Sequence, residues 1–269
     1  GDQAFEQRLY QPQNLEKIVA WGGYASMKHV TQYIQPGLEL ISLDPKRSAS
    51  ILGKGTFDSE ASMREAAVRL AADIGALNQK GCVCARVVYV QSGTDEAGLA
   101  QLNTLGRYVY DAMQTLPNTL STVPKRYDQN LKAEVDALRL DDEWYQVIGG
   151  KDGEGAIICS QIPEPVSFAT LLDDRTANLV PIDHLDEVMA AVDAYTQTVG
   201  IYPESVKDEL KDILPLYGAQ RIVSLGYAAV MKWAAPQDSI EPLRRMGKWI
   251  SNQIASPENT PAPWLRPSI

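Results

Sequence analysis

Segments typical of buried β-strands alternate with segments of helical periodicity along most of the chain. Within residues 59–77, Met63, Ala67, Leu70 and Ile74 recur at spacings of four, three and four residues, which is the period of an amphipathic helix. The strand-like segments are short runs of apolar and β-branched residues. They occur at 17–23, 38–43, 49–52, 85–90, 145–150, 155–161, 176–182, 198–203 and 221–226. This alternation predicts an α/β fold in which helices cover a largely parallel sheet.

Capping residues help to delimit the expected helices. Ser59 is the expected N-cap of the helix within 59–77, and Asp58 and Ser62 are the alternatives. Gly218 is a natural residue to follow the last turn of another helix. The other helical segments that we expect are 95–116, 127–139, 184–197, 204–218 and 239–254.

The order of these segments divides the chain into three parts. Residues 1–55 are expected to form the edge piece of one sheet domain, and residues 56–250 a second sheet domain. Residues 251–269 contain four prolines and are expected to form an extended tail.

Charge and composition narrow the class of protein. The 269 residues carry a formal net charge of −9, which argues against nonspecific nucleic-acid binding. No apolar run approaches the roughly 18 residues of a membrane-spanning helix, so we expect no membrane span. No basic-then-apolar leader opens the chain, so we expect no signal peptide. Three cysteines cannot all pair, which favours a reducing compartment such as the cytoplasm.

The cysteines and histidines do not follow the spacing of a structural zinc site. The chain has one Cys-x-Cys pair, a distant Cys159, and two histidines, His29 and His184. A structural zinc site usually takes four Cys or His ligands, often as spaced Cys-x-x-Cys pairs. We therefore expect no metal site and assign no role to either histidine.

Two of the three cysteines, Cys82 and Cys84, are separated by one residue just before a strand-like run. One interpretation is that both are core residues, because free cysteine is among the most buried residue types. The other is that one thiol is a nucleophile in the loop, with Lys80 and Arg86 near enough in sequence to favour its thiolate. Cys84 alternates with Arg86 and Val88 along the strand, which makes Cys84 the better core candidate.

The residues around Cys82 also carry a family resemblance. Residues 78–82 read NQKGC and are followed by the strand RVVYV, whose last valine lies eight residues after Cys82. This pattern resembles the catalytic loop of the aldehyde dehydrogenase superfamily, and more closely that of the long-chain fatty-acyl-CoA reductase family of bacterial bioluminescence. In that family Asn-Gln and two further residues precede the nucleophilic cysteine, which identifies Cys82 rather than Cys84.

Other segments resemble landmarks of the same family in the same order. Residues 17–23, KIVAWGG, resemble its strand and glycine turn. Residues 42–52 resemble its Gly-Pro-Lys-x-Ser segment, with Asp44 in place of the glycine and with Lys46 and Ser48 matching. The C-terminal landmarks are 197–201, 217–226 and 236–250, the last with Gln237 and Ser239 where the family pattern Pro-His-Asp-Gly has histidine and glycine.

The resemblance implies a fold and a chemistry. The fold is aldehyde-dehydrogenase-like, a three-layer sheet domain with helices on both faces. It also has an incomplete dinucleotide-binding portion, of which residues 1–55 would be the last part. The thiolate of Cys82 would attack an acyl thioester such as acyl-CoA, and NADPH would reduce the acyl-enzyme to a fatty aldehyde. Gly22 and Gly23 would lie near the nicotinamide, Glu164 would hold its ribose, and the Cys82 N–H would stabilise the oxyanion.

One departure bears on the outcome of the reaction. Ser42 stands where hydrolytic aldehyde dehydrogenases have the glutamate that activates water. An unperturbed hydroxyl is a poor base at neutral pH. The resemblance therefore implies reduction of a thioester rather than oxidation of an aldehyde to an acid.

The resemblance also indicates partners and leaves alternatives open. The family has a long N-terminal portion before the glycine turn, so these residues are expected to be a fragment, one of two subunits or an inactive domain. The expected partners are an acyl thioester, an acyl-transferring protein or a separate N-terminal half, and a second copy in a homo-oligomer. The main alternative is a noncatalytic assembly or acyl-carrier docking module with Cys82 merely packed. A phosphorylating aldehyde dehydrogenase is a further alternative.

Overall fold

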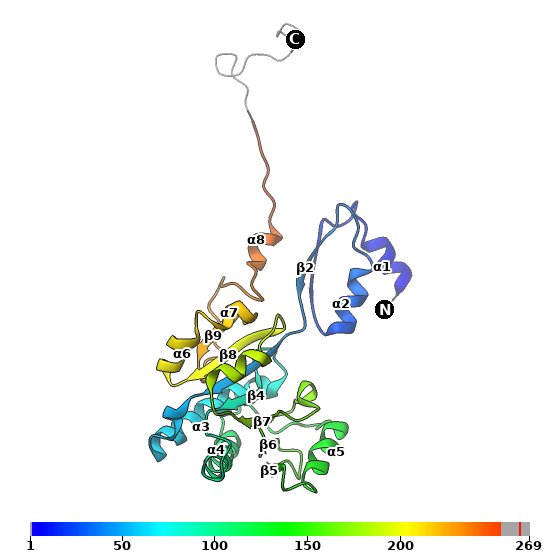
Figure 1. The fold of residues 1–269 in the computed structure, drawn as a ribbon. Coiled ribbons are helices and arrows are strands. Elements are labelled where there is room, and N and C mark those ends of the chain that lie inside the picture. Colours follow the sequence, from blue (N-terminus) through cyan, green and yellow to red (C-terminus); the bar gives the residue numbers. More distant parts are fainter. Residues whose placement is uncertain (1, 254–263, 265–269) are drawn as a thin grey trace.

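The computed structural model describes residues 2–253 and Trp264, and its strands form two separate sheets (Figure 1). The first sheet pairs β1 (Lys17–Trp21) with β2 (Glu39–Leu43) in parallel. Helix α1 (Gln3–Leu9) precedes this sheet, and α2 (Tyr24–Thr31) contacts β1.

The second sheet has seven strands in the spatial order β5-β6-β7-β4-β3-β8-β9. They are β3 (Arg47–Leu52), β4 (Ala85–Val90), β5 (Tyr145–Gly149), β6 (Ala156–Ser160), β7 (Thr176–Pro181), β8 (Thr196–Tyr202) and β9 (Arg221–Ser224). Strand β5 is antiparallel to β6, and the other five neighbouring pairs are parallel. Every residue of β6 is buried, as expected for a strand that is covered on both faces.

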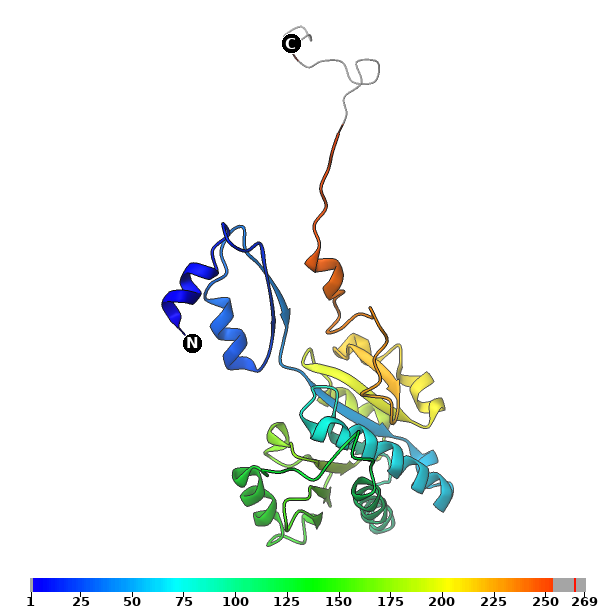
Figure 2. The same cartoon turned by 180° about the vertical axis from the view of Figure 1, so that it is seen from behind.

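Helices cover both faces of the seven-stranded sheet. They are α3 (Glu60–Gly75), α4 (Glu96–Gln114), α5 (Gln129–Leu138), η4 (Leu185–Ala191), α6 (Glu204–Leu210) and α7 (Leu214–Tyr217). On one face α3 and α4 share a core with β4, β6 and β7 (Figure 2). On the other face α5 packs on β5 and β6, and the helices between residues 185 and 217 pack on β3 and β8. The predicted three-layer α/β arrangement is confirmed.

Most of the expected elements form where the sequence placed them. Ser59 is the N-cap of α3, because its Oγ accepts a hydrogen bond of 3.1 Å from the backbone N–H of Ser62. Helices α4 and α5 fall within the expected ranges 95–116 and 127–139. Short 3-10 helices also form at η1 (Lys54–Phe57), η2 (Ala76–Gln79) and η3 (Ala169–Leu171).

Two expected helices are wrong. The segment 184–197 forms only the 3-10 helix η4, and β8 already begins at Thr196. Pairing with β3 buries Thr196 through Ile201. A buried strand rich in β-branched residues therefore forms where the end of the expected helix would lie. The segment 239–254 forms only α8 (Pro242–Met246), which ends where Gly247 takes an extended conformation. No residue of α8 is buried, and a helix without a packed face is marginal in water.

The expected helix over 204–218 is divided into α6 and α7, with Pro215 in the first turn of α7. Proline removes a backbone donor and fits the start of a helix, which explains the break. Gly218 follows α7 with a φ of 127°, as its expected position after the last turn requires.

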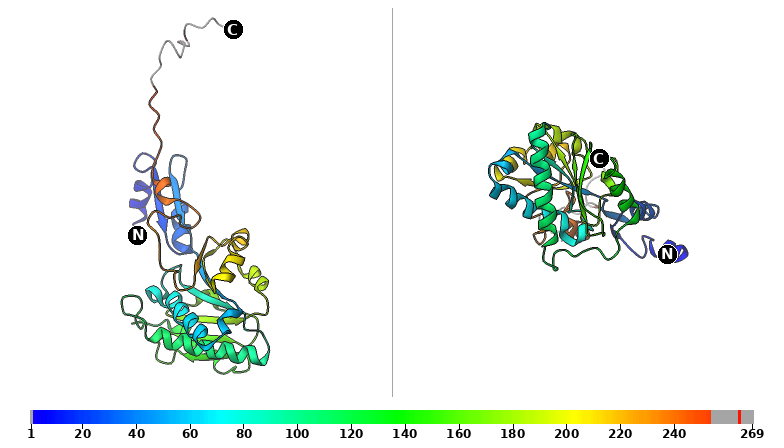
Figure 3. Two further views of the ribbon diagram at one scale, coloured as in Figure 1. Left: turned by 90° about the vertical axis from the view of Figure 1, so that its left-hand side faces the viewer. Right: turned by 90° about the horizontal axis from the view of Figure 1, so that it is seen from below.

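The chain leaves the first sheet after Leu43 and enters the second at Arg47, ahead of the expected boundary at residue 55. The segment around α8 returns to the first sheet, where Arg245 Nη2 lies 2.7 Å from Glu39 Oε1 (Figure 3). Most of the expected tail 251–269 lies outside the described residues. None of the described helices combines the length and apolarity needed to cross a membrane.

Candidate active site

The chain before Cys82 turns through a strained backbone conformation. After α3, residues Leu77, Asn78 and Gln79 have φ angles of 54°, 53° and 64°. Left-handed backbone costs about 1–2 kcal/mol for each residue other than glycine. Such strain persists only where surrounding contacts enforce it. The contacts of these residues therefore decide where Cys82 lies.

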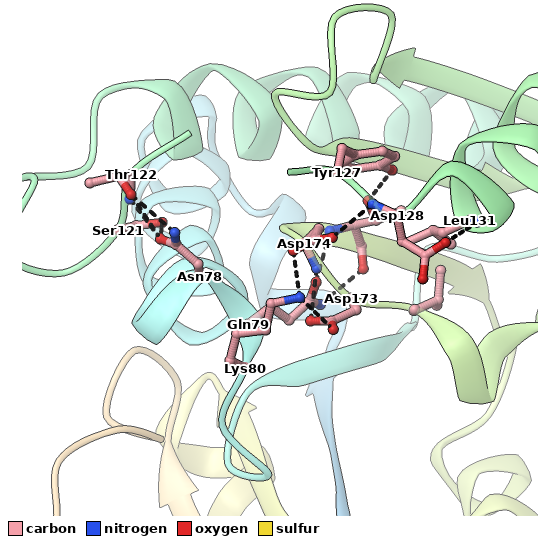
Figure 4. Close-up of polar contacts among 12 residues, drawn as sticks. Asn78, Gln79, Lys80, Ser121, Thr122, Tyr127, Asp128, Leu131, Asp173 and Asp174 are labelled. Carbon is pink, nitrogen blue, oxygen red and sulfur yellow. Dashed lines mark hydrogen bonds and ion pairs between the residues drawn. The ribbon is translucent and has the colours of Figure 1, made fainter. Parts of the chain in front are cut away.

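The side chains of Asn78 and Gln79 anchor this turn (Figure 4). Asn78 Oδ1 accepts from the backbone N–H of Thr122 at 2.7 Å. Gln79 is fully buried, and its Nε2 donates to the carbonyls of Ala85 at 2.8 Å and Thr176 at 2.9 Å. Its Oε1 accepts from the Thr176 N–H at 2.8 Å. The Asn-Gln pair thus ties the loop to the segment after α4 and to the starts of β4 and β7.

The two basic side chains near Cys82 are also used as anchors. Lys80 Nζ lies 2.7 Å from Asp173 Oδ2 and 2.6 Å from Asp174 Oδ1 (Figure 4). Arg86 donates to the carbonyls of Leu172 at 2.8 Å, Cys84 at 3.2 Å and Gln79 at 3.3 Å. Sequence proximity suggested that Lys80 and Arg86 could favour a thiolate at Cys82. Lys80 is instead paired with two carboxylates, and Arg86 holds the backbone carbonyls of the loop.

The three thiols lie in different surroundings. Cys84 is buried, and burial raises the pKa of its thiol to about 11. Cys159 is buried in β6, and burial raises the pKa of its thiol to about 12. Cys82 is only half-buried. Because a nucleophilic thiol must be reachable and able to ionise, the structure leaves Cys82 as the candidate and confirms Cys84 as a core residue.

Ser48 connects Cys82 with two strands of the large sheet. Its Oγ donates to the carbonyl of Cys82 at 2.6 Å and accepts from the N–H of Thr198 at 3.1 Å. Ser48 is buried at the start of β3, and Thr198 lies in β8. The cysteine is therefore fixed above the edge of the sheet where β3 and β8 begin.

Two cavities have residues that neighbour Cys82 in their walls. The first, of about 700 Å³, has Ser48, Arg86 and Glu164 in its wall, and we call it the Glu164 cavity. The second, of about 800 Å³, has Val83, Gln197 and Ala229 in its wall, and we call it the Gln197 cavity. Cys82 packs in one small apolar cluster with Val83 and Ala229, and Ser48 bonds its carbonyl. Ser48 of the Glu164 cavity and Val83 of the Gln197 cavity thus lie next to Cys82, which is itself in the wall of neither cavity.

The expected cofactor residues are divided between two places. Glu164 is exposed in the wall of the Glu164 cavity, beside Arg47 and Arg86. Gly22 and Gly23 follow β1 in the first sheet, and Gly23 is the N-cap of α2. A Cβ at Gly23 would meet nothing within 4 Å, so its surface is open. In the described part of the chain, neither glycine is in the wall of the two cavities.

Other residues that the sequence singled out have local contacts. The Ser42 hydroxyl donates to Asp44 Oδ1 at the end of β2. Lys46 Nζ donates to the carbonyl of Ala194 at 2.8 Å. His29 Nε2 pairs with Glu6 Oε2 at 2.8 Å in the N-terminal segment. His184 begins η4, where its backbone N–H donates to a glutamate side chain.

Sequence reasoning missed two residues, the buried Asp73 and the half-buried Arg221, that position the segment beside Cys82. Asp73 of α3 is 1% exposed and accepts from the N–H groups of Gly226 at 2.8 Å and Ala228 at 2.9 Å. Arg221 Nη1 donates to the carbonyl of Ala228 at 2.6 Å. Together they fix the segment that packs Ala229 against the cluster of Cys82. The sequence pattern that could have indicated this role is an aspartate beside Ile74, on the inward side of the expected helix.

Asp73 should make stability depend on pH. Burial raises the pKa of this carboxyl to about 6, against the lowering effect of its two N–H donors. A group with a raised folded-state pKa stabilises the fold below its unfolded pKa, and that stabilisation is lost as the pH rises through about 6. Relative to Asp73→Asn, the wild-type free energy of unfolding should fall by about 2 kcal/mol between pH 4 and pH 7. Urea denaturation at a series of pH values measures this difference.

Asp136 supplies a control with the opposite sign. Its hydrogen bond with Lys132 lowers the pKa of its carboxyl. Relative to Asp136→Asn, the wild type should therefore lose stability as the pH falls. A wild-type to Asp73→Asn difference that does not change with pH would contradict the assignment of a buried, titrating carboxyl.

Comparison with known proteins bears on these observations. The model of the family described as "Acyl-CoA reductase (LuxC)" matches residues 2–249. The chain belongs to the LuxC acyl-CoA reductase family. It is 24% identical over 256 residues to a long-chain acyl-protein thioester reductase of Photorhabdus luminescens, covering 91% of this chain and 48% of the relative. It is 26% identical to a protein of the same name from Aliivibrio fischeri, covering 94% and 49%.

Members of the LuxC family that it matches are thus about twice as long, and the chain spans about half of their length. Among solved structures, the chain resembles an NADP-dependent glyceraldehyde-3-phosphate dehydrogenase from Bacillus halodurans, complexed with NADP. The TM-score is 0.60 at 10% identity, over 81% of this chain and 46% of that one. This likeness confirms the predicted aldehyde-dehydrogenase fold.

Proposed function

We propose that this chain is the catalytic-cysteine portion of an acyl thioester reductase. In this proposal Cys82 accepts the acyl group of a thioester, and the group is released as an aldehyde. The observation that carries the proposal is the setting of Cys82. It is a half-buried thiol in an anchored loop, and its neighbours Val83 and Ser48 are in the walls of two cavities, whereas Cys84 and Cys159 are buried. The relatives named as thioester reductases support the substrate class.

The first step needs a reactive sulfur and a place for negative charge. The thiolate of Cys82 adds to the thioester carbonyl carbon and forms a new C–S bond. The old C–S bond then breaks, and the donor thiol leaves and takes up a proton. The backbone N–H of Cys82 has no acceptor within the described residues, so it is free to donate to the oxyanion.

The residues of the Glu164 cavity fit the nicotinamide end of NADPH. The cavity has an exposed carboxylate at Glu164, which can accept hydrogen bonds from ribose hydroxyls, and its wall includes Ser48, which bonds the Cys82 carbonyl. NADPH, when bound, supplies the hydride that reduces the acyl carbon. Cys82 then leaves as a thiolate when the aldehyde departs. We also propose that Gly22 and Gly23 lie against the dinucleotide. The choice of NADPH over NADH rests on the family likeness.

The direct test follows the fate of the acyl group. The purified chain is incubated with a decanoyl thioester without a hydride donor, and the intact mass and the released acid are followed over time. We expect one decanoyl group per chain that persists, and that hydroxylamine removes. If no adduct forms on the folded chain, acyl transfer by this portion is contradicted, and a noncatalytic docking module becomes the better explanation.

Ser42 provides a second prediction for the same adduct. Serine offers no carboxylate to activate water, and the family likeness puts position 42 where hydrolytic aldehyde dehydrogenases carry that glutamate. Replacing Ser42 with glutamate should accelerate hydrolysis of the acyl-enzyme by about 100-fold, a typical effect of a general base. Ser42→Gln, of the same size but without a basic group, should leave hydrolysis slow. Equal acid release from both variants would contradict this role for position 42.

A further inference from the structure

Two charged side chains hold the segment that follows β9, residues 226–230, which we call the post-β9 segment. Asp73, in the last turn of α3, accepts from the N–H groups of Gly226 at 2.8 Å and Ala228 at 2.9 Å. Arg221 of β9 donates to three carbonyls of the segment, those of Tyr227 at 3.3 Å, Ala228 at 2.6 Å and Val230 at 2.5 Å. The backbone of Ala228 therefore lies between a carboxylate, which takes its N–H, and a guanidinium, which takes its C=O.

The place of Asp73 is unfavourable for a carboxylate unless the segment is there. The residue is 1% exposed, and it lies at the C-terminal end of a helix, where the dipole disfavours negative charge. Burial raises the pKa of its carboxyl to about 6, and the two N–H donors and the charge of Arg221 oppose that rise. A buried charge is tolerated only with such partners. Asp73, Arg221 and the post-β9 segment thus form one interdependent unit.

The post-β9 segment reaches the surroundings of Cys82 through Ala229. A small buried cluster consists of Ala76, Val83 and Cys84, and both Cys82 and Ala229 pack against it. Ala229 is also in the wall of the Gln197 cavity together with Val83. A displacement of the segment would therefore disturb the cluster that supports Cys82.

A series of hydrogen bonds joins Arg221 to Cys82 by a second route. Arg221 Nη1 donates to Thr198 Oγ1 at 3.4 Å, and the N–H of Thr198 donates to Ser48 Oγ at 3.1 Å. Ser48 Oγ donates in turn to the carbonyl of Cys82 at 2.6 Å. Thr198 and Ser48 are both buried, and they belong to the adjacent strands β8 and β3. The same guanidinium thus contacts both of the structures that support Cys82.

We propose that Arg221 and Asp73 are positioning residues for the acylation of Cys82. This inference rests on the proposed function, because it explains how the thiol is held where a thioester must reach it. The two residues act on the sulfur through the post-β9 segment and through Ser48. A misplacement of about 1 Å can lower a reaction rate by about 100-fold, so weaker hold on these supports should slow acylation strongly.

The first test measures how fast Cys82 is acylated at saturation. Intact mass is followed at a series of concentrations of the decanoyl thioester of N-acetylcysteamine, for the native chain and for Arg221→Lys. Lysine keeps the charge, but its single ammonium cannot reproduce the planar fork that reaches three carbonyls. We expect the maximal acylation rate to fall about 10-fold, while the thioester concentration at half the maximal rate changes less than about twofold. An unchanged maximal rate would overturn the inference.

Arg139→Lys is the matched control. Arg139 is also half-buried and also donates to backbone carbonyls, those of Val147 at 3.2 Å and Gly149. These carbonyls belong to β5, at the opposite edge of the sheet from β9. Arg139→Lys should therefore acylate at the native rate. An equal loss of acylation in the two arginine variants would overturn the positioning role and leave only an effect of stability.

Asp73 provides a graded series. Asp73→Asn keeps one acceptor for the two N–H groups of the segment, whereas Asp73→Ala keeps none. Hydrogen exchange of peptides that cover residues 226–230 is followed by mass spectrometry at pH 7.5. We expect exchange to be slowest in the native chain, faster in Asp73→Asn and fastest in Asp73→Ala, with acylation rates falling in the same order. Native exchange and native acylation in Asp73→Asn and Asp73→Ala would overturn the role of Asp73.

Alkylation separates this inference from the proposed function, because iodoacetamide is small and needs no acyl site. Labelling of Cys82 by limiting iodoacetamide should be at least threefold faster in Arg221→Lys than in the native chain, and unchanged in Arg139→Lys. This result would support the hold on Cys82 even if no thioester acylated any of the chains, which would contradict the proposed function alone. Identical labelling of Cys82 in the native chain and in Arg221→Lys would overturn the inference.

Discussion

Replacing Cys82 with alanine is expected to abolish acylation of the chain by a long-chain acyl thioester. The proposal gives the whole covalent step to one sulfur, and removing a nucleophile typically lowers the rate by 10⁴-fold or more, as an order of magnitude. The other two thiols are buried, and burial raises the pKa of Cys84 to about 11 and that of Cys159 to about 12, so neither can substitute at neutral pH. Intact-mass measurement of the decanoyl adduct records the effect.

The matched control is the neighbouring cysteine. Cys84→Ala removes a fully buried sulfur and should lower stability by about 1 kcal/mol while acylation continues. Acylation that survives Cys82→Ala but disappears in Cys84→Ala would reverse the assignment of the two residues.

Replacing Gln79 with leucine is expected to destabilise the fold by about 3–5 kcal/mol. Its side-chain amide makes three hydrogen bonds, to the carbonyls of Ala85 and Thr176 and from the Thr176 N–H, in a fully buried site. Leucine would leave buried backbone groups without partners, each at about 1–3 kcal/mol. It would also remove a contact that holds the left-handed turn before Cys82. Urea denaturation measures the change in the free energy of unfolding.

The same variant should acylate more slowly than the wild type, because the loop that presents Cys82 is no longer held. Gln146→Leu is the control for stability. Gln146 is exposed in β5, and its replacement should change stability by less than about 0.5 kcal/mol. If Gln79→Leu were as stable as Gln146→Leu, the anchoring role of the motif glutamine would be wrong.

The sheet was largely predictable because several of its inner strands are buried on both faces. Segments such as 85–90 and 176–182 contain β-branched or apolar runs with little helical periodicity, and they form β4 and β7. Burial on both faces produces such runs in a parallel sheet. The spatial order of the strands, and the position of β4 at the centre, depend on pairings between distant segments that composition does not encode.

The errors in the helices have a common physical cause. Helical periodicity in 184–197 and 239–254 is a local property, whereas the outcome depended on tertiary contacts. Pairing with β3 drew Thr196 and its successors into β8. The segment around α8 has no buried face, so only five residues form a helix. Propensity is a weak prior when packing decides otherwise.

The candidate site was predictable only in part. The NQKGC motif singled out Cys82, and alternation along the strand placed Cys84 in the core. The resemblance did not indicate that Asn78, Gln79 and Lys80 hold the loop through contacts with distant segments. The bonds from Asp73 to the segment after β9 span more than 150 residues, and no local pattern reveals them.

The most direct measurement of the central claim is thiol mapping of the native chain. Limiting iodoacetamide is added with and without prior incubation with a decanoyl thioester, and the labelled peptides are quantified by mass spectrometry. We predict that Cys82 is labelled far faster than Cys84 or Cys159, and that the thioester blocks this labelling by leaving a decanoyl group on Cys82. Labelling of Cys82 no faster than that of the buried thiols, with no acyl group on it, would contradict the assignment of Cys82 as the nucleophile.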